Sequence, residues 1–177
     1  MKIVMIGCAG LLGTAQLIQS GSEILEKRFS SRFLKNTMEK IHRAEAVTDE
    51  LRAELFDPAF SSFLYDVTES GEGGVYAALW NLGTARGCGL TAELKKMPVL
   101  QETIEIANEL DINPYKMSSR GVFVAFFKDE DKLKEIFLKK EVPFEVIGGI
   151  IKYNKRVVMI GEDKETYLEP LRSTREG

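Results

Sequence analysis

The sequence contains few of the residues that build disulfide frameworks, histidine-based catalytic sites or membrane spans. Two cysteines, Cys8 and Cys88, and one histidine, His42, occur among 177 residues. Two cysteines do not make a disulfide framework, so we expect reduced thiols in a cytoplasmic protein. His42 lies in a charged helical stretch, where we expect it to face solvent. No apolar run approaches the about 20 residues of a membrane-spanning helix, and we expect no signal peptide and no membrane partner.

The charge balance gives no reason to expect a polyanionic partner. The chain has 24 lysines and arginines against 27 aspartates and glutamates, for a formal net charge of -3. Domains that bind nucleic acid carry an excess of positive charge, so we expect no nucleic-acid partner. The length and the apolar fraction of 44% are those of one globular domain with a sizeable core.

Hydrophobic periodicity alternates between strand and helix along the chain. Strands are predicted at residues 2–6, 63–67, 89–97 and 121–127, and as a hairpin within residues 143–161. Helices are predicted at residues 14–28, 29–41, 48–56, 75–82 and 100–110, and after the capping residue Asp129. This order predicts an α+β fold (α/β layered), in which helices pack on a mixed β-sheet. It does not determine the order of the strands.

The first predicted strand leads into a glycine-rich turn. Gly7, Gly10 and Gly13 have the spacing G-x-x-G-x-x-G, which also occurs in Rossmann-type short-chain dehydrogenases. Against that alternative, no second strand with an acidic end follows, and no tyrosine has a lysine four residues later. Backbone N–H groups and the helix dipole make such a turn a candidate anion site. The alternative is that the glycines only permit a tight turn.

A second turn repeats the arrangement of strand, glycines and helix. The oxygen-bearing side chains at the end of its strand and the glycines of its turn are Asp66, Thr68, Glu69, Gly71, Gly73 and Gly74. Carboxylates beside a phosphate-binding turn can hold Mg²⁺, so Asp66 and Glu69 are metal candidates in a chain where we otherwise expect no metal site. The alternative is that Asp66 and Thr68 cap the turn and the following helix.

A third candidate anion-binding site directly precedes the buried strand predicted at 121–127. There Ser119 and Arg120 stand directly before Gly121. An arginine can offer a bidentate fork to a phosphate or carboxylate, although one at the start of a strand can also simply face solvent. If both glycine turns and Arg120 converge, they form an anion-binding cleft at the edge of the sheet.

Longer runs of the sequence resemble a known family. These are GCAGLLGTAQLI near the start, DVTESGEGGVYAALWNLGTARGCGLTAELKKMPV, and ETIEIANELDINPYKMSSRG. Together they resemble the C-terminal domain of the aminoimidazole-ribonucleotide (AIR) synthetase-related superfamily, and within it the hydrogenase-maturation branch, whose Asp-x-Thr-x-Gly-Gly turn precedes a helix. The resemblance covers residues 2–151. Here the turn is three residues longer, because Ser70, Gly71 and Glu72 precede Gly73 and Gly74.

The resemblance implies a C-terminal-type domain over residues 1–168 and a frayed tail over 169–177, without the ATP-binding N-terminal domain of the family. It implies a domain that binds phosphate or another anionic ligand and acts with a separately encoded ATP-binding partner. The family's enzymes are ATP-dependent ligases, kinases and dehydratases. No cysteine follows Cys88, whereas the carbamoyl-dehydrating members end in a reactive one, so we expect no independent activity of that kind.

On this interpretation the chain alone has no cofactor, and ATP and Mg²⁺ enter with the partner. Two alternatives stay open. One is a non-catalytic interaction module that forms a homodimer through the surface that the missing half would cover. The other is the short-chain dehydrogenase.

Overall fold

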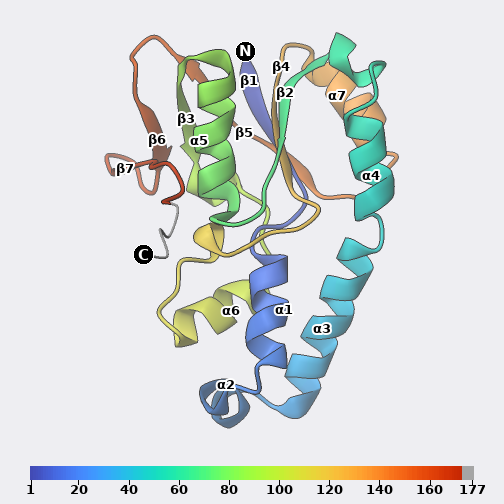
Figure 1. The fold of residues 1–177 in the computed structure, drawn as a ribbon, viewed down its shortest axis with the longest axis vertical. Coiled ribbons are helices and arrows are strands. Elements are labelled where there is room, and N and C mark those ends of the chain that lie inside the picture. Colours follow the sequence, from blue (N-terminus) through green and yellow to red (C-terminus); the bar gives the residue numbers. More distant parts are fainter. Residues whose placement is uncertain (173–177) are drawn as a thin grey trace.

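The computed structural model describes residues 1–172, which form a mixed seven-stranded sheet with helices on both faces (Figure 1). The strand order is β2-β4-β1-β5-β3-β6-β7. The predicted α+β architecture is therefore confirmed. The last part of the predicted frayed tail, residues 173–177, lies outside the described residues.

The strands of the sheet are β1 (Lys2–Ile6), β2 (Leu64–Glu69), β3 (Gly89–Glu93), β4 (Phe123–Phe127), β5 (Phe144–Ile151), β6 (Arg156–Met159) and β7 (Glu165–Tyr167). β1 lies near the centre and is antiparallel to both of its neighbours, β4 and β5. β3 and β6 run parallel. Because β1 and β4 are covered on both faces, their sequences are nearly continuous apolar runs rather than alternating ones.

The helices are α1 (Leu11–Gln19), α2 (Glu23–Arg28), α3 (Ser31–Glu45), α4 (Thr48–Leu55), α5 (Gly74–Arg86), α6 (Gln101–Glu109) and α7 (Glu130–Phe137), with 3₁₀ turns at Phe60–Ser62, Leu94–Lys96 and Pro114–Lys116. As predicted, Asp129 caps α7, where its carboxylate accepts from the N–H of Lys132 at 3.0 Å. Four details differ from prediction. The helix predicted at 14–28 is broken by Gly21 in the left-handed conformation (φ 68°), the strand predicted at 89–97 ends at Glu93, and β7 was not predicted. The hairpin predicted within 143–161 is also wrong, because β3 lies between β5 and β6 and pairs with both.

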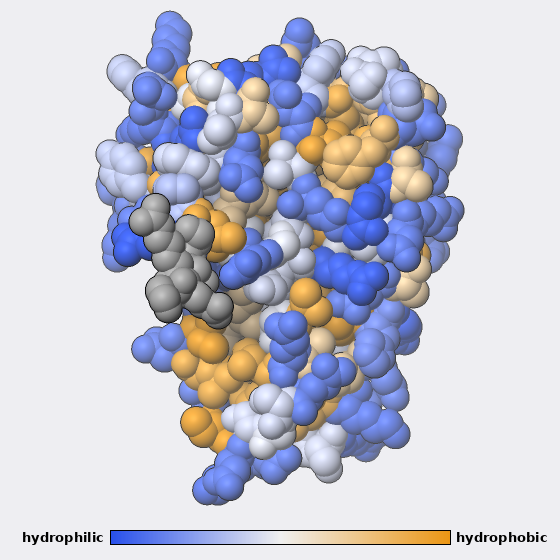
Figure 2. Space-filling model, in the orientation of Figure 1, coloured by the Kyte–Doolittle hydropathy of each residue, from blue (hydrophilic) through white to orange (hydrophobic). Residues whose placement is uncertain are grey.

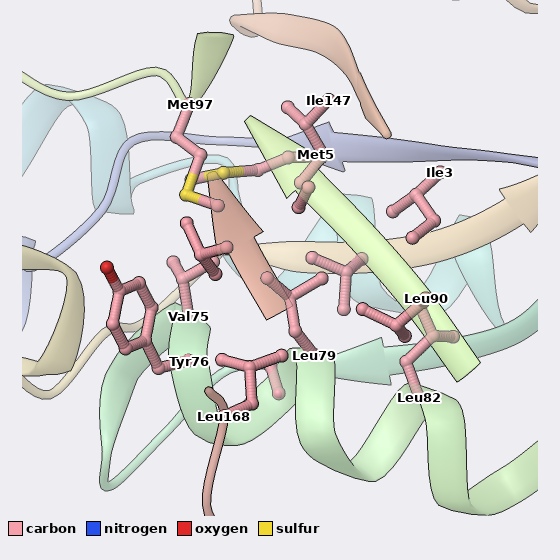
Figure 3. Close-up of a cluster of buried hydrophobic side chains, with 14 of the residues drawn as sticks. Ile3, Met5, Val75, Tyr76, Leu79, Leu82, Leu90, Met97, Ile147 and Leu168 are labelled. Carbon is pink, nitrogen blue, oxygen red and sulfur yellow. The ribbon is translucent and has the colours of Figure 1, made fainter. Parts of the chain in front are cut away.

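Each face of the sheet has its own hydrophobic core. Ile3 and Met5 of β1 point to the face covered by α5, where Val75, Leu79 and Leu82 lie against them (Figure 3). The intervening Val4 and Ile6 point to the opposite face, and the second core there contains these residues of α4, α7 and β4: Leu51, Leu55, Leu133, Phe137, Phe123 and Phe127. Burying each such side chain stabilises the fold by about 1.5–3 kcal/mol relative to leaving it exposed.

Four helices form a smaller part of the molecule beyond one end of the sheet. α1, α2, α3 and α6 lie below the strands in Figure 1, and a third small core of Leu11, Ala15 and Ile41 holds α1 against α3. Hydrophobic surface is visible over the region of α2 and α6 (Figure 2), and Ile24 and Ile112 are exposed. No helix among residues 1–172 has the length and apolar character that crossing a membrane requires. The glycine turns lie where this helical part meets the sheet.

Candidate functional site

The first glycine turn connects β1 to α1 and is packed tightly against the chain around residues 114–121. Gly7 and Gly10 have positive φ angles of 89° and 72°, which favour glycine. A Cβ on Gly10 would lie 2.8 Å from the carbonyl oxygen of Pro114, and one on Gly7 would overlap the carbonyl oxygen of Gly121. Glycine is therefore required at both positions by close backbone packing.

The predicted anion-binding amides of this turn already have acceptors within the protein. The N–H of Gly7 donates to the carbonyl oxygen of Pro143 at 2.7 Å, and that of Gly13 donates to the carbonyl oxygen of Ser118 at 2.9 Å. The N–H of Gly10 donates to Ser119 Oγ, also at 2.9 Å. In this conformation these three N–H groups stabilise the turn itself and are not presented to a ligand.

The second glycine turn, residues 70–74, connects β2 to α5 and lies beside the first. Gly73 and Gly74 have φ angles of 80° and 67°, and a Cβ on Gly74 would lie 2.6 Å from the carbonyl oxygen of Met117. Gly71 is exposed, and a Cβ there would have nothing within 4 Å. The base of this turn is thus packed, whereas its tip faces solvent.

Ser119 joins the two turns. Its Oγ accepts from the N–H of Gly10 at 2.9 Å, and its own N–H donates to the carbonyl oxygen of Gly71 at 3.1 Å. Its side chain is 3% exposed, so both bonds are shielded from water. Two turns that are more than 60 residues apart in the sequence are therefore held side by side, and Arg120 follows directly at their junction.

The oxygen-bearing side chains of β2 bind in different directions. Asp66 has a left-handed backbone (φ 56°) at an irregularity in the pairing of β2, and its carboxylate accepts from Arg86 Nε at 2.6 Å. Thr68 Oγ1 donates to the carbonyl oxygen of Asp66 at 2.9 Å, so the predicted alternative, in which Asp66 and Thr68 cap the following helix, is wrong: α5 begins at Gly73 without a side-chain cap. Glu69 accepts from Arg52 Nε and Nη2 at 2.7 and 2.6 Å.

The two metal candidates are therefore not brought together, because Asp66 and Glu69 bind arginines at the end of α5 and on α4, respectively. Within residues 1–172 there is no group of three or more histidine, cysteine, aspartate and glutamate side chains that could hold a metal ion. The two carboxylates instead act as acceptors that fix arginine side chains.

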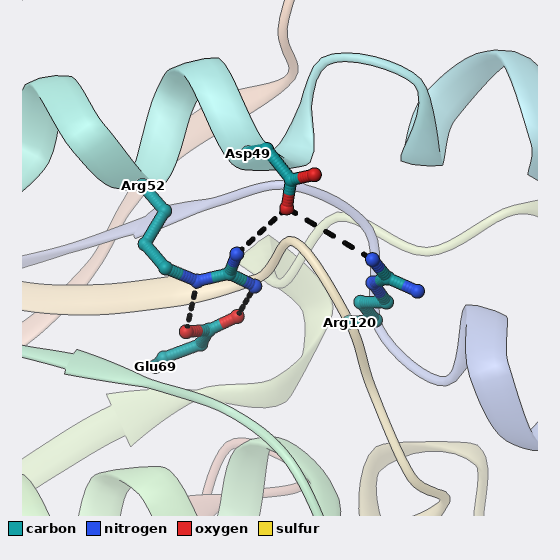
Figure 4. Close-up of polar contacts among 4 residues, drawn as sticks. All are labelled: Asp49, Arg52, Glu69 and Arg120. Carbon is teal, nitrogen blue, oxygen red and sulfur yellow. Dashed lines mark hydrogen bonds and ion pairs between the residues drawn. The ribbon is translucent and has the colours of Figure 1, made fainter.

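Two arginines approach one carboxylate beside the second turn (Figure 4). Arg52 Nη1 donates to Asp49 Oδ1 at 2.8 Å, and Arg120 Nη2 lies 3.9 Å from the same oxygen. The hydrogen bonds that Arg52 donates to Glu69, followed by the one that it donates to Asp49, raise the pKa of Arg52 further above its usual range, so this guanidinium is permanently charged. The sequence pattern pointed to Arg120 but not to Arg52. The only signal for Arg52 was its i,i+3 spacing from Asp49 on a predicted helix.

The cysteine thiols are not activated for nucleophilic chemistry. Burial raises the pKa of the Cys8 thiol, and desolvation also raises that of Cys88. A reactive cysteine needs the opposite shift, because the thiolate is the nucleophile. His42 is exposed on α3, as predicted.

No protein-family model matches this chain, and no curated protein sequence matches it. Its fold is similar to that of three proteins of known structure. HypE in a HypE–HypF complex matches with a TM-score of 0.69 at 14% identity, over 96% of this chain and 52% of that one. Thiamine-monophosphate kinase from Stenotrophomonas maltophilia K279a matches with a TM-score of 0.64 at 16% identity, over 89% and 49%. PurL of T. maritima, complexed with ADP, matches with a TM-score of 0.56 at 16% identity, over 94% and 24%.

These likenesses confirm the predicted resemblance at the level of the fold. The chain spans about half the length of the HypE and kinase chains and about a quarter of PurL. The sheet differs from that of the dehydrogenase alternative, because β1 is antiparallel to both neighbours, whereas a Rossmann sheet is mostly parallel. That alternative has no support in the fold.

Proposed function

We propose that this chain is an anion-binding domain of the AIR-synthetase type, which holds a phosphate or other anionic ligand beside the second glycine turn. The observation that carries the proposal is the bridge made by Ser119. Its bonds to Gly10 and Gly71 fix the two turns together and bring Arg120 next to the exposed tip of the second turn. A positively charged fork beside a glycine turn at the start of a long helix is suited to an oxyanion.

The two turns have different roles in this proposal. The first turn supports the site from inside, because its N–H groups donate to the protein itself. The second turn is the one that contacts the ligand, since Gly71 is exposed and α5 directs its partly positive N-terminus toward it. Leu171 lies against Gly73 at this end of α5, so the segment after β7 borders the site.

We further propose that catalysis requires a second, nucleotide-binding protein. HypE has been solved in complex with ATP and PurL with ADP, and this chain covers about half and a quarter of those proteins. ATP and Mg²⁺ would then enter with the partner, and the chain alone would have no independent activity. The free thiols of Cys8 and Cys88 support a reducing, cytoplasmic compartment.

A calorimetric titration of the full chain with inorganic phosphate tests the anion site. We expect Arg120→Gln to weaken phosphate binding by about tenfold or more, because a hydrogen bond to a charged group is lost. Arg32→Gln, at an exposed position of α3, is the matched control and should leave binding unchanged. Phosphate binding that is equal in the wild type and Arg120→Gln would contradict the proposed site.

A parallel titration with ATP and Mg²⁺ tests the need for a partner. The chain alone should bind ATP no more tightly than it binds inorganic phosphate, and a nucleotide-binding protein should co-purify with it from the native source. Tight binding of ATP by the chain alone would contradict this part of the proposal. A dimer in sedimentation experiments, without any phosphate binding, would favour the homodimeric interaction module instead.

A further inference from the structure

The pair Arg52 and Arg120 already holds an anionic oxygen, and that oxygen belongs to the protein. Both guanidinium groups approach Asp49 Oδ1, at 2.8 and 3.9 Å (Figure 4). The Asp49 side chain is 81% exposed and uses this one oxygen for both contacts. A carboxylate oxygen between two guanidinium groups marks a position that an oxygen of a phosphate can also occupy.

The Asp49 carboxylate is held less firmly than the neighbouring Glu69 carboxylate. Glu69 binds Arg52 through both of its oxygens, at 2.6 and 2.7 Å, and is 28% exposed. Exposed ion pairs like those of Asp49 contribute little to stability, because water solvates the separated charges well. An incoming anion can therefore displace Asp49, while Glu69 keeps Arg52 in its orientation.

The backbone around the two arginines is fixed before a ligand arrives. Thr48, which precedes Asp49 on α4, is 1% exposed and packs directly on Gly121, the residue after Arg120. A Cβ on Gly121 would overlap Thr48 Oγ1, and Gly121 has a φ of 73°. The Thr48 side chain thus packs on the backbone of the segment with Arg120, which holds the start of α4 and that segment, and hence the main-chain positions of both arginines, close together.

Thr48 Oγ1 is also one of the few buried side-chain oxygens without a hydrogen-bond partner within the described part of the chain. Ser70 Oγ, at the start of the second glycine turn, is another. Buried polar atoms normally have partners, so two without them, one next to Asp49 and one next to Glu69 in the sequence, indicate polar groups that are not saturated by the protein alone.

We propose that Asp49 is a built-in competitor for the anion site, and that a phosphate group binds to Arg52 and Arg120 in exchange for the Asp49 carboxylate. The proposal rests on the anion site proposed above and adds Arg52 to it. A phosphate dianion carries more charge than one carboxylate and has more acceptor oxygens, so it can bind both forks at once. Asp49 keeps the arginines paired when ligand is absent and makes binding depend on ligand concentration.

The test compares the affinity for inorganic phosphate of the wild type and of Asp49→Asn, by calorimetry at about pH 8, where phosphate is a dianion. Asparagine keeps the shape of the side chain and removes the competing charge. We expect Asp49→Asn to bind phosphate about threefold to tenfold more tightly, as expected from the loss of an exposed ion pair. Asp131→Asn is the matched control, because Asp131 occupies the same second position of α7, another eight-residue helix. It should leave the affinity unchanged.

The outcomes separate this inference from the proposed function. Phosphate binding that depends on Arg120 but is equal or weaker in Asp49→Asn would leave the anion site standing and overturn the exchange. Equal phosphate affinities of the wild type and Arg120→Gln would contradict the site itself. A carbon-13 carboxyl signal assigned to Asp49 gives a direct readout, because it should move toward the position of an unpaired aspartate when phosphate saturates the chain. A signal that stays unchanged would also overturn the exchange.

Discussion

The two glycine turns share a sequence pattern but differ in their surroundings. Both follow a strand, both begin a helix with a left-handed glycine, and both have more than one glycine with positive φ. In the first turn Gly7 and Gly10 are buried, and their N–H groups donate to Pro143 and Ser119. In the second, Gly71 is exposed. The availability of a glycine turn for a ligand thus depends on what packs on it.

The segment at residues 114–121 causes this difference. It lies against Gly7, Gly10 and Gly13 of the first turn, whereas in the second turn it lies against Gly74 and, through the Ser119 N–H, binds Gly71. The first turn is therefore packed inside the structure and connects its parts, whereas the tip of the second turn stays open to solvent. A substitution that is harmless in one turn should be severe in the other.

The largest effect is expected when the same change, glycine to alanine, is made in each turn. Gly7→Ala places a methyl group against the Gly121 carbonyl at a positive φ, so we expect a loss of about 3 kcal/mol or more of unfolding free energy. Gly71→Ala places it in open space at an ordinary φ, and we expect a change within about 0.5 kcal/mol. Urea denaturation of both variants provides the measurement.

A control separates backbone strain from overlap. Gly21 also has a positive φ of 68°, but a Cβ there would have nothing within 4 Å. Gly21→Ala should therefore cost only about 1 kcal/mol, from strain alone. If Gly7→Ala were no worse than Gly21→Ala, the first turn would not be the packed joint that its contacts indicate.

Local patterns predicted much of the fold, but not its irregularities. β1 and β4 were predicted because long runs of apolar, β-branched and aromatic residues occur where both faces of a strand are buried. The break at Gly21 was missed, since a single glycine is tolerated in a helical pattern. β7 was missed because its three residues, Glu165–Tyr167, have no apolar alternation, and their pairing with β6 is set by the tertiary fold.

The candidate site was predicted only in part, because local sequence patterns reveal some of its residues and the tertiary fold brings in the others. Asp66, Glu69 and Arg120 stand at strand ends and turns, where local sequence reveals them. Arg52 lies in a charged helix, where its i,i+3 spacing from Asp49 is a weak signal, and its bonds to Glu69 arise only because the fold brings Glu69 near. Likewise, no local sequence pattern predicts that the Gly10 N–H donates to a serine more than 100 residues away.

The bridge between the turns gives the next largest effect. Ser119→Ala removes the acceptor of the buried Gly10 N–H, and a buried donor without a partner costs about 1–3 kcal/mol. Ser118→Ala keeps the main-chain oxygen that accepts from Gly13 and serves as the neighbouring control, with an expected change within about 0.5 kcal/mol. Amide hydrogen exchange at Gly10 should also accelerate in Ser119→Ala. Equal stability of the two variants would show that the bridge does not hold the turns together.

The smallest effect concerns the helices around the first turn, where Lys40 of α3 binds Glu102 of α6. The hydrogen bond from Lys40 lowers the pKa of the Glu102 carboxyl. Because the folded pKa lies below the unfolded value of about 4.3, this contribution is present at neutral pH and is lost as the pH falls through the folded pKa. Lys40→Met should therefore lower the free energy of unfolding by about 0.5 kcal/mol at pH 7, and the difference from wild type should shrink below about pH 4.

Lys35→Met, at an exposed position of the same helix, should show no such pH dependence. A difference between Lys40→Met and wild type that persists unchanged in acid would mean that the lysine acts through packing of its side chain, not through its charge.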